Sequence, residues 1–526
     1  MRPIVPLSTE TDPWRALLSR DDIRMVDGIL HVVDDVSTPS DAERDDLLAV
    51  ASAIESAGVR VLLVRDANRR PKIVVDTADA GDVLNALRDP GLGPVYLKAR
   101  GEDPVPAHSA TAPTGAVAAY AVYRPRTSTE GSYRYGAPLA PRLELWRFGT
   151  TTVEAPRPSA LTRRRFAAAD LDLVEVERYG RTWTTVSGMF DPHPHEFTED
   201  VDMVFSWVDG SSSEFQRQRA ARMQGYVVGD GDDNAARYRQ VDELRYALRS
   251  VHMYAPWVRR IFIATDSPTP EWLSDHPQVT IVRSEEFFAD PSVLPTHNSH
   301  AVEAQLHRIP GLAEHFLYSN DDMFFGRPVT PELFFSGGGV SRFVESGVRI
   351  GSGPAHTERS GHDNALRVNR ALLKERFGRV ITLDLEHCAT PLRRSIAYEL
   401  EREFADDYAR TAASRFRSSS DISVTNSLYH HYALATGRAV ITTEPRTRYV
   451  QTTQLDALRR MERLLTARDT DMFCLNDGSV PEIPEEVRVP ALRACLERYF
   501  PIAAPWEKTA VSAGSAGASS AATPGR

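Results

Sequence analysis

The fold is decided by an alternation of apolar and amphipathic segments that begins with VDMVFSWVDG (201–210) and ends with HFLYSNDD (315–322). Between these two predicted strands the chain predicts, in order, a helix in VDELRYALRSVHMYAP (241–256), a strand in VRRIFIATD (258–266), a short helix in PEWLSDH (270–276), a strand in QVTIVRS (278–284) and a helix in SHAVEAQLHRI (299–309). This alternation predicts an α/β fold with a mostly parallel, Rossmann-like sheet. In such a sheet the chemistry lies at the carboxyl ends of the strands.

The rest of the chain divides around this sheet. Residues 1–195 predict an accessory α/β domain, because strand-like and helix-like segments alternate there without a catalytic motif. Residues 196–507 contain the predicted sheet and form the predicted catalytic domain, in which the polar stretch 211–236 is expected to be a mobile loop. The low-complexity tail, 508–526, has a composition that cannot bury a core and predicts disorder.

Three segments after the sheet matter for the site. The Gly-rich stretch 336–370 is expected to form loops over it. PLRRSIAYELEREFADDY (391–408) predicts a helix that has Thr390 as its cap and Pro391 as its first residue. A second helix is predicted over 421–436.

Composition excludes several classes of protein. The net charge of -10 argues against sequence-independent nucleic-acid binding, so nucleic acid is not an expected partner. The chain has no run of 18 apolar residues and no apolar signal segment at its start, which predicts neither a membrane span nor secretion by that route and leaves peripheral membrane association open. The cysteines are too few and scattered for a disulfide framework or a zinc site, and they fit a reducing cytosol: Cys388, Cys474 and Cys495.

The acids at the ends of the first and the last predicted strand are candidates for the site. After the first strand, Trp207 can stack on a nucleotide base and Asp209 can bind a ribose hydroxyl or a metal; the alternative is a core tryptophan beside a turn. After the last strand, Asn320 precedes the adjacent acids Asp321 and Asp322. Such acids can hold Mg²⁺ or Mn²⁺ against a diphosphate, since hard cations prefer oxygen ligands. The alternative is a solvated turn or a helix cap.

Three later segments offer further chemistry. His387 precedes a predicted helix start, where it can act as a general base or donate to a phosphoryl oxygen; a structural histidine is the alternative. RFRSSSD (415–421) places Arg417 and several hydroxyl side chains before another predicted helix, an arrangement that can bind an anion. The alternative is a pair of exposed arginines in a loop. Asn476 and Asp477 form a turn signal and are candidate metal or substrate ligands.

Taken together, these segments resemble the Stealth family in motif, order and spacing. That family includes bacterial capsule and exopolysaccharide phosphotransferases and the animal lysosomal-enzyme N-acetylglucosamine-1-phosphotransferase. VDMVFSWVDG is similar to the first conserved block, and the second block is similar to the run from LRYALRSVHMYAP through FLYSNDDMFFG. The segment from His387 to Arg417 is similar to the third block, with one histidine where the animal enzyme has two, and CLND (474–477) is similar to the fourth.

The resemblance implies a glycosyltransferase-A-like fold, a UDP-sugar donor, a glycan acceptor and a divalent cation, Mg²⁺ or Mn²⁺. By their matching positions, the implied catalytic residues are Asp321, Asp322, His387 and Arg417. The nucleotide-sugar site is expected to contain the strand-end residues Trp207, Asp209 and Asn320, and Asp421, the acid that follows Arg417. The expected metal ligands are Asp322, Asn476 and Asp477.

The implied reaction is transfer of a hexose-1-phosphate, such as N-acetylhexosamine-1-phosphate, to a glycan hydroxyl, with release of UMP. Positioning and charge stabilisation dominate such chemistry. Arg417 and the cation would neutralise the diphosphate, while His387 or an acid of the Asp321/Asp322 pair would take the hydroxyl proton. Two alternatives stay open: a metal-dependent UDP-sugar glycosyltransferase that releases UDP, and a non-catalytic glycan- or nucleotide-binding module.

Overall fold

The computed structural model describes residues 13–113, 115–210, 241–478 and 481–508. The expected mobile loop of residues 211–236 and all of the expected tail except Lys508 lie outside the described residues. None of the described helices combines the length and the apolar character needed to cross a membrane.

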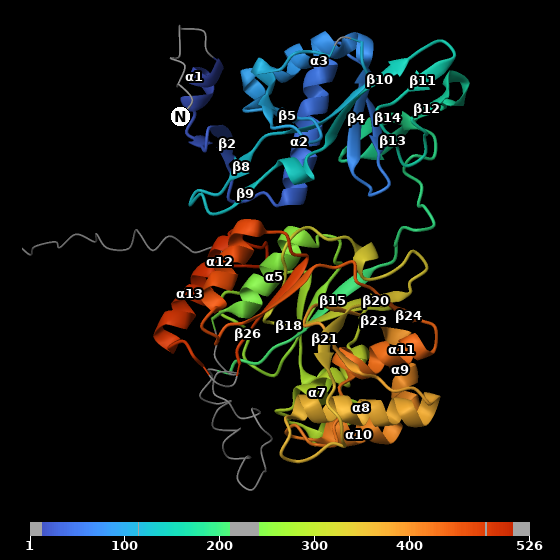
Figure 1. Cartoon of the computed structure of the whole chain (residues 1–526), viewed down its shortest axis with the longest axis vertical. Helices are drawn as coiled ribbons and strands as arrows, with labels where there is room; N and C mark the ends of the chain where they lie inside the picture. The colour runs from blue at the N-terminus through green and yellow to red at the C-terminus, as the bar shows by residue number, and fades with distance from the viewer. Residues whose placement is uncertain (1–12, 114, 211–240, 479–480, 509–526) are drawn as a thin grey trace, which may run out of the picture.

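A five-stranded sheet, in strand order β17-β16-β15-β18-β23, forms the centre of the catalytic part (Figure 1). Its strands are β15 (Val201–Ser206), β16 (Ile261–Ala264), β17 (Val279–Val282), β18 (His315–Asn320) and β23 (Thr390–Arg393). Strands β15 to β18 are parallel, and β23 runs antiparallel to β18. The ends of β15 and β18 meet at one edge, where Ser206 pairs with Asn320. The predicted α/β fold with a mostly parallel sheet is confirmed.

Helices cover both faces of this sheet because the side chains of β15 alternate between two hydrophobic cores. Met203 and Phe205 pack into one core and Val204 into the other, each at most 1 % exposed. Burial of one such side chain contributes about 1.5–3 kcal/mol. The first core includes residues of α5 (Glu243–Tyr254), α12 (Ala457–Ala467) and α13 (Glu485–Tyr499), and the second includes residues of α7 (Ser299–Glu303), α9 (Arg394–Glu403), α10 (Ala405–Ala413) and α11 (Tyr429–Ala435).

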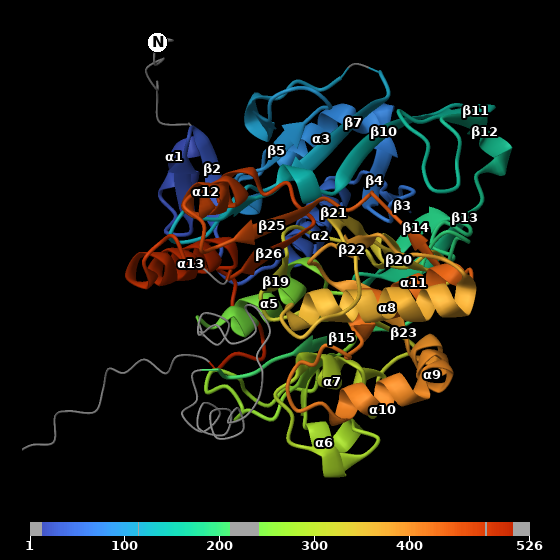
Figure 2. The same ribbon diagram turned by 60° about the horizontal axis from the view of Figure 1, so that its bottom comes forward.

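A second, three-stranded sheet adjoins the carboxyl end of β18. Strand β19 (Met323–Phe325) continues directly from the acids after β18 and pairs with β26 (Met472–Asn476), which pairs with β25 (Thr447–Gln451). Two short ladders pair β20 (Ser341–Phe343) with β24 (Ala439–Ile441) and β21 (Glu345–Arg349) with β22 (Leu383–Leu385). Figure 2 shows α8 (Gly361–Phe377) running past these ladders. Segments far apart in sequence therefore gather at this edge.

The predicted helix over 391–408 is wrong at its start. Thr390 and Pro391 belong to β23, and the helical part is divided into α9 and α10 at Phe404. Pro391 is tolerated because β23 is an edge strand, where a missing N–H need not cost a ladder hydrogen bond. His387 accordingly precedes a strand and not a helix N-terminus.

Four other predicted elements differ from the structure. The helix predicted over 299–309 is split into α7 and a 3-10 turn at Leu306–Arg308, and 270–276 forms turns instead of a helix. The stretch 336–370, predicted as loops, includes strands and the start of α8. The helix predicted over 421–436 begins as a π-helical segment, η10 (Val424–Leu428), and continues as α11.

The N-terminal region has its own sheets and core. One sheet has the order β1-β2-β8-β9, and the larger has the order β12-β11-β10-β7-β5-β6 with β3 and β4 attached through β10. The strands are β1 (Ile23–Val26), β2 (Ile29–Val33), β3 (Leu62–Arg65), β4 (Pro71–Asp76), β5 (Tyr96–Lys98), β6 (Val105–Pro106), β7 (Ala118–Tyr123), β8 (Arg126–Thr127), β9 (Arg134–Tyr135), β10 (Arg142–Phe148), β11 (Thr152–Glu154), β12 (Arg165–Ala167), β13 (Leu173–Arg178) and β14 (Arg181–Val186). The helices are α1 (Pro13–Leu18), α2 (Pro39–Ser56) and α3 (Ala80–Leu87). The expected boundary at 195 lies between β14 and β15 and stays a prediction.

Aromatic and charged contacts join the N-terminal region to the catalytic part. Tyr133 is a member of the core that contains α5 and α13, and the Tyr254 hydroxyl donates to the Tyr133 hydroxyl at 3.3 Å. The Arg468 guanidinium lies 4.5 Å from the Tyr133 ring centroid and 4.2 Å from that of Tyr499. The two parts therefore share a core.

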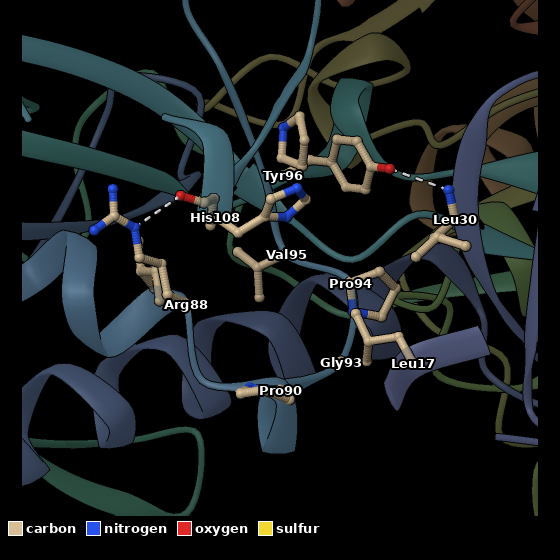
Figure 3. Close-up of a pocket in the computed structure, with 12 residues that line it drawn as sticks. Leu17, Leu30, Arg88, Pro90, Gly93, Pro94, Val95, Tyr96 and His108 are labelled. Atoms are coloured by element: carbon tan, nitrogen blue, oxygen red, sulfur yellow. Dashed lines mark hydrogen bonds between the residues drawn. The ribbon is translucent and has the colours of Figure 1, made fainter. Parts of the chain in front are cut away.

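A small pocket lies within the N-terminal region (Figure 3). Its lining is mainly apolar, and its polar groups already have partners: Tyr96 accepts a hydrogen bond from the Leu30 amide, and Arg88 donates to the carbonyls of Ala107 and Ala110. All residues that line the pocket come from this region, so the pocket contains none of the candidate site residues.

Candidate active site

The acids after β18 meet the end of β26. The Asn476 side-chain amide donates to Asp322 Oδ2 at 2.9 Å, and the Cys474 thiol donates to the same oxygen at 3.4 Å. The Leu475 amide also donates to the Asp322 carbonyl at 3.0 Å. Asp322 Oδ1 is buried and has no hydrogen-bond partner among the described residues. The structure thus brings together Asp322 of the second conserved block and Asn476 of the fourth.

Among the residues that the structure describes, no cation balances the charge of this acid pair. Burial, the neighbouring Asp322 carboxylate and Glu243 raise the pKa of Asp321 well above its ordinary value. Within the described part of the chain, no arginine or lysine forms an ion pair with Asp321 or Asp322. Burial and the Asp322 carboxylate likewise raise the pKa of Cys474, which keeps it a thiol that donates. Two adjacent carboxyls with a spare oxygen are the donor set that a hard divalent cation prefers.

His387 reaches the same site through Tyr449. The Tyr449 hydroxyl donates to Asn476 Oδ1 at 3.2 Å, and the His387 ring lies 5.2 Å from the Tyr449 ring, centroid to centroid. His387 is also 6.3 Å from the ring of His362. The first turn of α8 therefore adjoins the loop that precedes β23.

Arg417 is held between the first residues of α7 and α8. Its Nη2 donates to Ser299 Oγ at 2.9 Å, and its aliphatic stem packs against Gly361. Arg417 and Glu303 both act on the buried hydroxyl of Tyr318, whose pKa is raised by burial and by the Glu303 carboxylate and is lowered in part by Arg417.

Tyr318 connects the Arg417 side to the strand ends. Its hydroxyl donates to Asn320 Oδ1 at 2.8 Å and lies 2.8 Å from Ser206 Oγ. These bonds fix the Asn320 side chain directly beside the acid pair. Asn320, Asp321, Asp322, His387 and Arg417 are therefore assembled around one edge of the sheet.

Asp421 lies beneath this site. It is fully buried and accepts hydrogen bonds from the Asn298 side-chain amide at 2.8 Å and from the Ser418 backbone amide at 2.8 Å. These bonds order the loop that presents Arg417. The expected contact of Asp421 with a nucleotide-sugar stays a prediction.

The residues after β15 are divided between core and edge. Trp207 is 8 % exposed and belongs to the hydrophobic core on the α5 side. The Asp209 backbone amide donates to Ser267 Oγ at 2.8 Å, which ties the turn to the loop after β16. Stacking by Trp207 and ribose binding by Asp209 stay predictions.

Asp477 has a cationic partner. Its Oδ2 lies 2.6 Å from Arg488 Nη1, and both side chains are buried. Thr452 also donates a hydrogen bond to Asp477. Asp477 is thus next to Asn476 in the chain, but its carboxylate is already neutralised, and its role as a metal ligand stays a prediction.

Another group of potential metal ligands lies between the two parts of the chain, at His193, His195 and Glu196. Glu196 is an unfavourable ligand there because it pairs with Arg65 at 2.5 Å and with Arg69 at 3.5 Å. These guanidiniums already compensate its charge.

Sequence reasoning missed the pair formed by His362 and Asp384. His362 Nε2 lies 2.8 Å from Asp384 Oδ2. Burial opposes ionisation of Asp384, but the hydrogen bond and charge of His362, the hydrogen bond from the Leu385 amide and, least, the charge of His387 outweigh it and lower the pKa of the acid. Both residues lay in stretches without a motif, and only the pairing of β21 with β22 places Asp384 beside α8.

Comparison with known proteins decides the family. Four models of conserved regions of Stealth proteins match in order: CR1 at 199–227, CR2 at 237–343, CR3 at 386–434 and CR4 at 462–515. The chain is 50% identical over 491 residues to the exopolysaccharide phosphotransferase CpsY of Mycobacterium tuberculosis, a match that covers 90% of each chain. The chain belongs to the Stealth family. The exopolysaccharide phosphotransferase of Nocardia farcinica is another relative, 59% identical over 366 residues, with 70% of this chain and 72% of that protein covered.

The expected resemblance to the Stealth family is confirmed, and the chain is an enzyme of the phosphotransferase class. A relative from Streptomyces coelicolor, exopolysaccharide phosphotransferase SCO6023, is 38% identical over 499 residues and covers 90% of this chain and 83% of its own length. Among solved structures, the galactosyltransferase LgtC in complex with donor and acceptor sugar analogues matches 58% of this chain and 96% of that chain, with 12% identity and a TM-score of 0.29.

Proposed function

We propose that this Stealth protein transfers a hexose-1-phosphate, such as N-acetylhexosamine-1-phosphate, from a UDP-sugar to a hydroxyl of a glycan and releases UMP. The product is a sugar–phosphodiester–sugar linkage in a capsule or exopolysaccharide. The observation that supports this reaction is the acid pair Asp321 and Asp322 at a strand end, which no cation among the described residues compensates. The same site contains a histidine and an arginine whose stem packs against Gly361. That set suits a diphosphate held by a cation.

The residues present fit a divalent cation. Asp322 has a buried oxygen without a partner in the described chain, and the Asp321 carboxyl, whose ionisation a cation would favour, lies beside it. Asp321, Asp322 and Asn476 would hold Mg²⁺ or Mn²⁺, with Asp477 as a further candidate. When bound, such an ion supplies positive charge against the diphosphate oxygens of the donor.

Arg417 would bind the transferred phosphate from the side of α8. Its guanidinium has a fixed charge and a fork of donors, and Nη2 donates to Ser299 Oγ. Trp207, Asp209, Asn320 and Asp421 would shape the nucleotide-sugar site. The acceptor oxygen then attacks the sugar-proximal phosphorus, the P–O bond to UMP breaks, and the glycosidic C1–O bond stays intact. A side chain of the protein receives the hydroxyl proton, and the candidates include His387 and the Asp321/Asp322 pair.

Product analysis tests the proposal. The full-length protein is incubated with Mg²⁺ or Mn²⁺, a panel of UDP-sugars and a glycan acceptor, and the products are examined by phosphorus NMR and mass spectrometry. A phosphodiester with equimolar UMP supports the proposal. Release of UDP with a new glycosidic bond would instead identify a glycosyltransferase, and donor binding without turnover would identify a binding module.

A further inference from the structure

The pair of His362 and Asp384 has the form of an oriented base. Asp384 is 10 % exposed in its side chain and lies behind the ring, whereas the His362 side chain is 37 % exposed. Because the acid is ionised, His362 Nε2 is the donor in their hydrogen bond at 2.8 Å. The lone pair of the neutral ring is then on Nδ1, for which the described residues provide no hydrogen-bond donor. A buried carboxylate that fixes the tautomer of an accessible imidazole is a recurring arrangement in general-base catalysis.

A second histidine–carboxylate pair in the same protein shows the contrast. His307 Nε2 lies 2.9 Å from Glu401 Oε2, but the His307 side chain is only 2 % exposed. Its ring packs edge-on against Tyr398 and Tyr408. That pair serves the packing of α9 and α10 and offers no nitrogen to a substrate. The exposure of His362 is therefore not required by the hydrogen bond to its acid.

His362 lies between Arg417 on one side of the site and His387, which leads to Asn476, on the other. The preceding residue, Gly361, touches the stem of Arg417, which would hold the transferred phosphate. On its other side the His362 ring lies 6.3 Å from the ring of His387, which contacts Tyr449 and through it Asn476. His387 has ring contacts but no side-chain hydrogen bond within the described chain, so nothing there fixes its tautomer. Of the two imidazoles, His362 is the oriented one.

We propose that His362 is the general base that activates the acceptor hydroxyl, and that Asp384 is the residue that positions it. This inference rests on the proposed function. His362 Nδ1 takes the proton of the acceptor hydroxyl while the oxygen forms a bond to the sugar-proximal phosphorus. The P–O bond to UMP breaks, UMP leaves with that electron pair, and the imidazolium passes its proton to solvent. His387 then packs between the base and Tyr449.

The charged and titratable groups around His362 come from four segments. Asp384 contacts the ring from β22 and His387 from the loop before β23. Arg417, from the loop before η10, lies with its stem against the preceding residue, Gly361. On α8 itself, Asp363 pairs with Arg359 at 3.7 Å and also with Arg367. Of these groups, the Asp384 carboxylate is the one that is hydrogen-bonded to the His362 ring.

The test compares His362→Gln with the matched control His307→Gln in the full-length protein. Glutamine can keep the hydrogen bond to the acid in each case but cannot act as a base. For His362→Gln we expect the transfer rate to fall about 100- to 10,000-fold, which is the usual range for general acid–base catalysis, with UDP-sugar affinity unchanged in calorimetry. The acidic limb of the pH–rate profile should also disappear. His307→Gln should lower the thermal midpoint and keep both the rate per folded molecule and the limb.

A second pair of variants separates catalysis from structure. In His362→Ala, added imidazole should restore part of the transfer rate, more strongly as the fraction of neutral imidazole rises. Asp384→Asn should lower the rate without such rescue, because the His362 ring is present but its tautomer is no longer fixed. Asp384→Glu should recover part of the rate.

Failure of the His362 assignment can be distinguished from failure of the proposed function. If the wild-type protein releases UDP instead of UMP, the proposed function fails whatever His362 does. If it releases UMP, and folded His362→Gln keeps at least a third of the rate with the acidic limb intact, then the assignment of His362 is overturned. Loss of the limb in His387→Ala, with its retention in His362→Gln, would give the role to His387.

Discussion

Gly361→Ala should disable Arg417 without a change to any polar group. A Cβ at Gly361 would lie 2.6 Å from Arg417 Cβ, 2.7 Å from its Cδ and 3.1 Å from its Cγ. These atoms belong to the stem next to the backbone, so rotation of the guanidinium end cannot relieve the overlap. The arginine, which donates to Ser299, must therefore move as a whole.

The size of the effect follows from these distances. Carbon atoms in contact prefer about 3.5–4.0 Å, so the Arg417 stem has to recede by about 1 Å. A misplacement of about 1 Å in a group that positions the reacting phosphate costs on the order of 100-fold in rate. That loss corresponds to about 2.7 kcal/mol of transition-state stabilisation. Stability should change less, because alanine gains about 0.5–1 kcal/mol over glycine in a helix while overpacking costs about 1–3 kcal/mol.

The assay is the initial rate of UMP release with saturating UDP-sugar and acceptor, beside urea unfolding of each variant. Gly81→Ala is the matched control, since Gly81 also lies in the first turn of a helix, α3, and a Cβ there would meet nothing within 4 Å. It should leave the rate unchanged. A folded Gly361→Ala protein with the wild-type rate would show that Arg417 does not act where the structure holds it.

Four other changes have defined outcomes. Asp321→Asn or Asp322→Asn should lower turnover by orders of magnitude in a folded protein, and EDTA should abolish activity that Mg²⁺ or Mn²⁺ restores; normal turnover in either variant removes that acid from the mechanism. Arg417→Lys should slow both donor hydrolysis and transfer because the charge stays but the bidentate fork is lost. Burial lowers the pKa of His430 to about 3, so the folded state stays neutral while the unfolded chain binds a proton below pH ~6.5. The free energy of unfolding should therefore fall as pH drops from ~6.5, by about 2 kcal/mol at pH ~5. In His430→Gln, the free energy of unfolding measured with urea should depend less on pH. Tyr133→Ala should cost about 3–5 kcal/mol in unfolding free energy, the usual loss for a buried large aromatic side chain, and a loss under 1 kcal/mol would show that the two parts are held together elsewhere.

The central sheet could be predicted because its information is local. Each strand from β15 to β18 is a short apolar run followed by a polar turn, and the intervening segments are long enough for crossover connections. Strand β23 could not be predicted in this way. Its sequence, TPLR, has a proline that favours a helix start, and only antiparallel pairing with β18 at the sheet edge makes it a strand.

The candidate site was predictable at the strand ends and not beyond them. Asp321 and Asp322 follow an apolar run, and strand ends meet at one edge of a parallel sheet whatever the loops do. Asp384 and His362 had no such marker, because their hydrogen bond joins a glycine-rich segment to a strand 22 residues later. Asp477 shows the converse case: its turn motif was visible, but its partner Arg488 comes from α13 and its neutralisation is a tertiary effect.

The N-terminal region supports the site from a distance. Tyr133 contacts Arg468, which precedes β26, and Arg468 also contacts Tyr499, whose hydroxyl donates to the Gly326 carbonyl just after β19 at 2.8 Å. Strand β19 begins directly after Asp322, and β26 ends at Asn476, which donates to Asp322. The contacts of Arg468 and Tyr499 therefore fix one end of this sheet, and its other end forms the proposed metal site. Removal of residues 1–195 would therefore expose a shared core as well as remove a domain. A loss of activity after such a deletion would not by itself show that the N-terminal region binds the acceptor, whereas a loss of acceptor affinity alone, in a protein of unchanged stability, would.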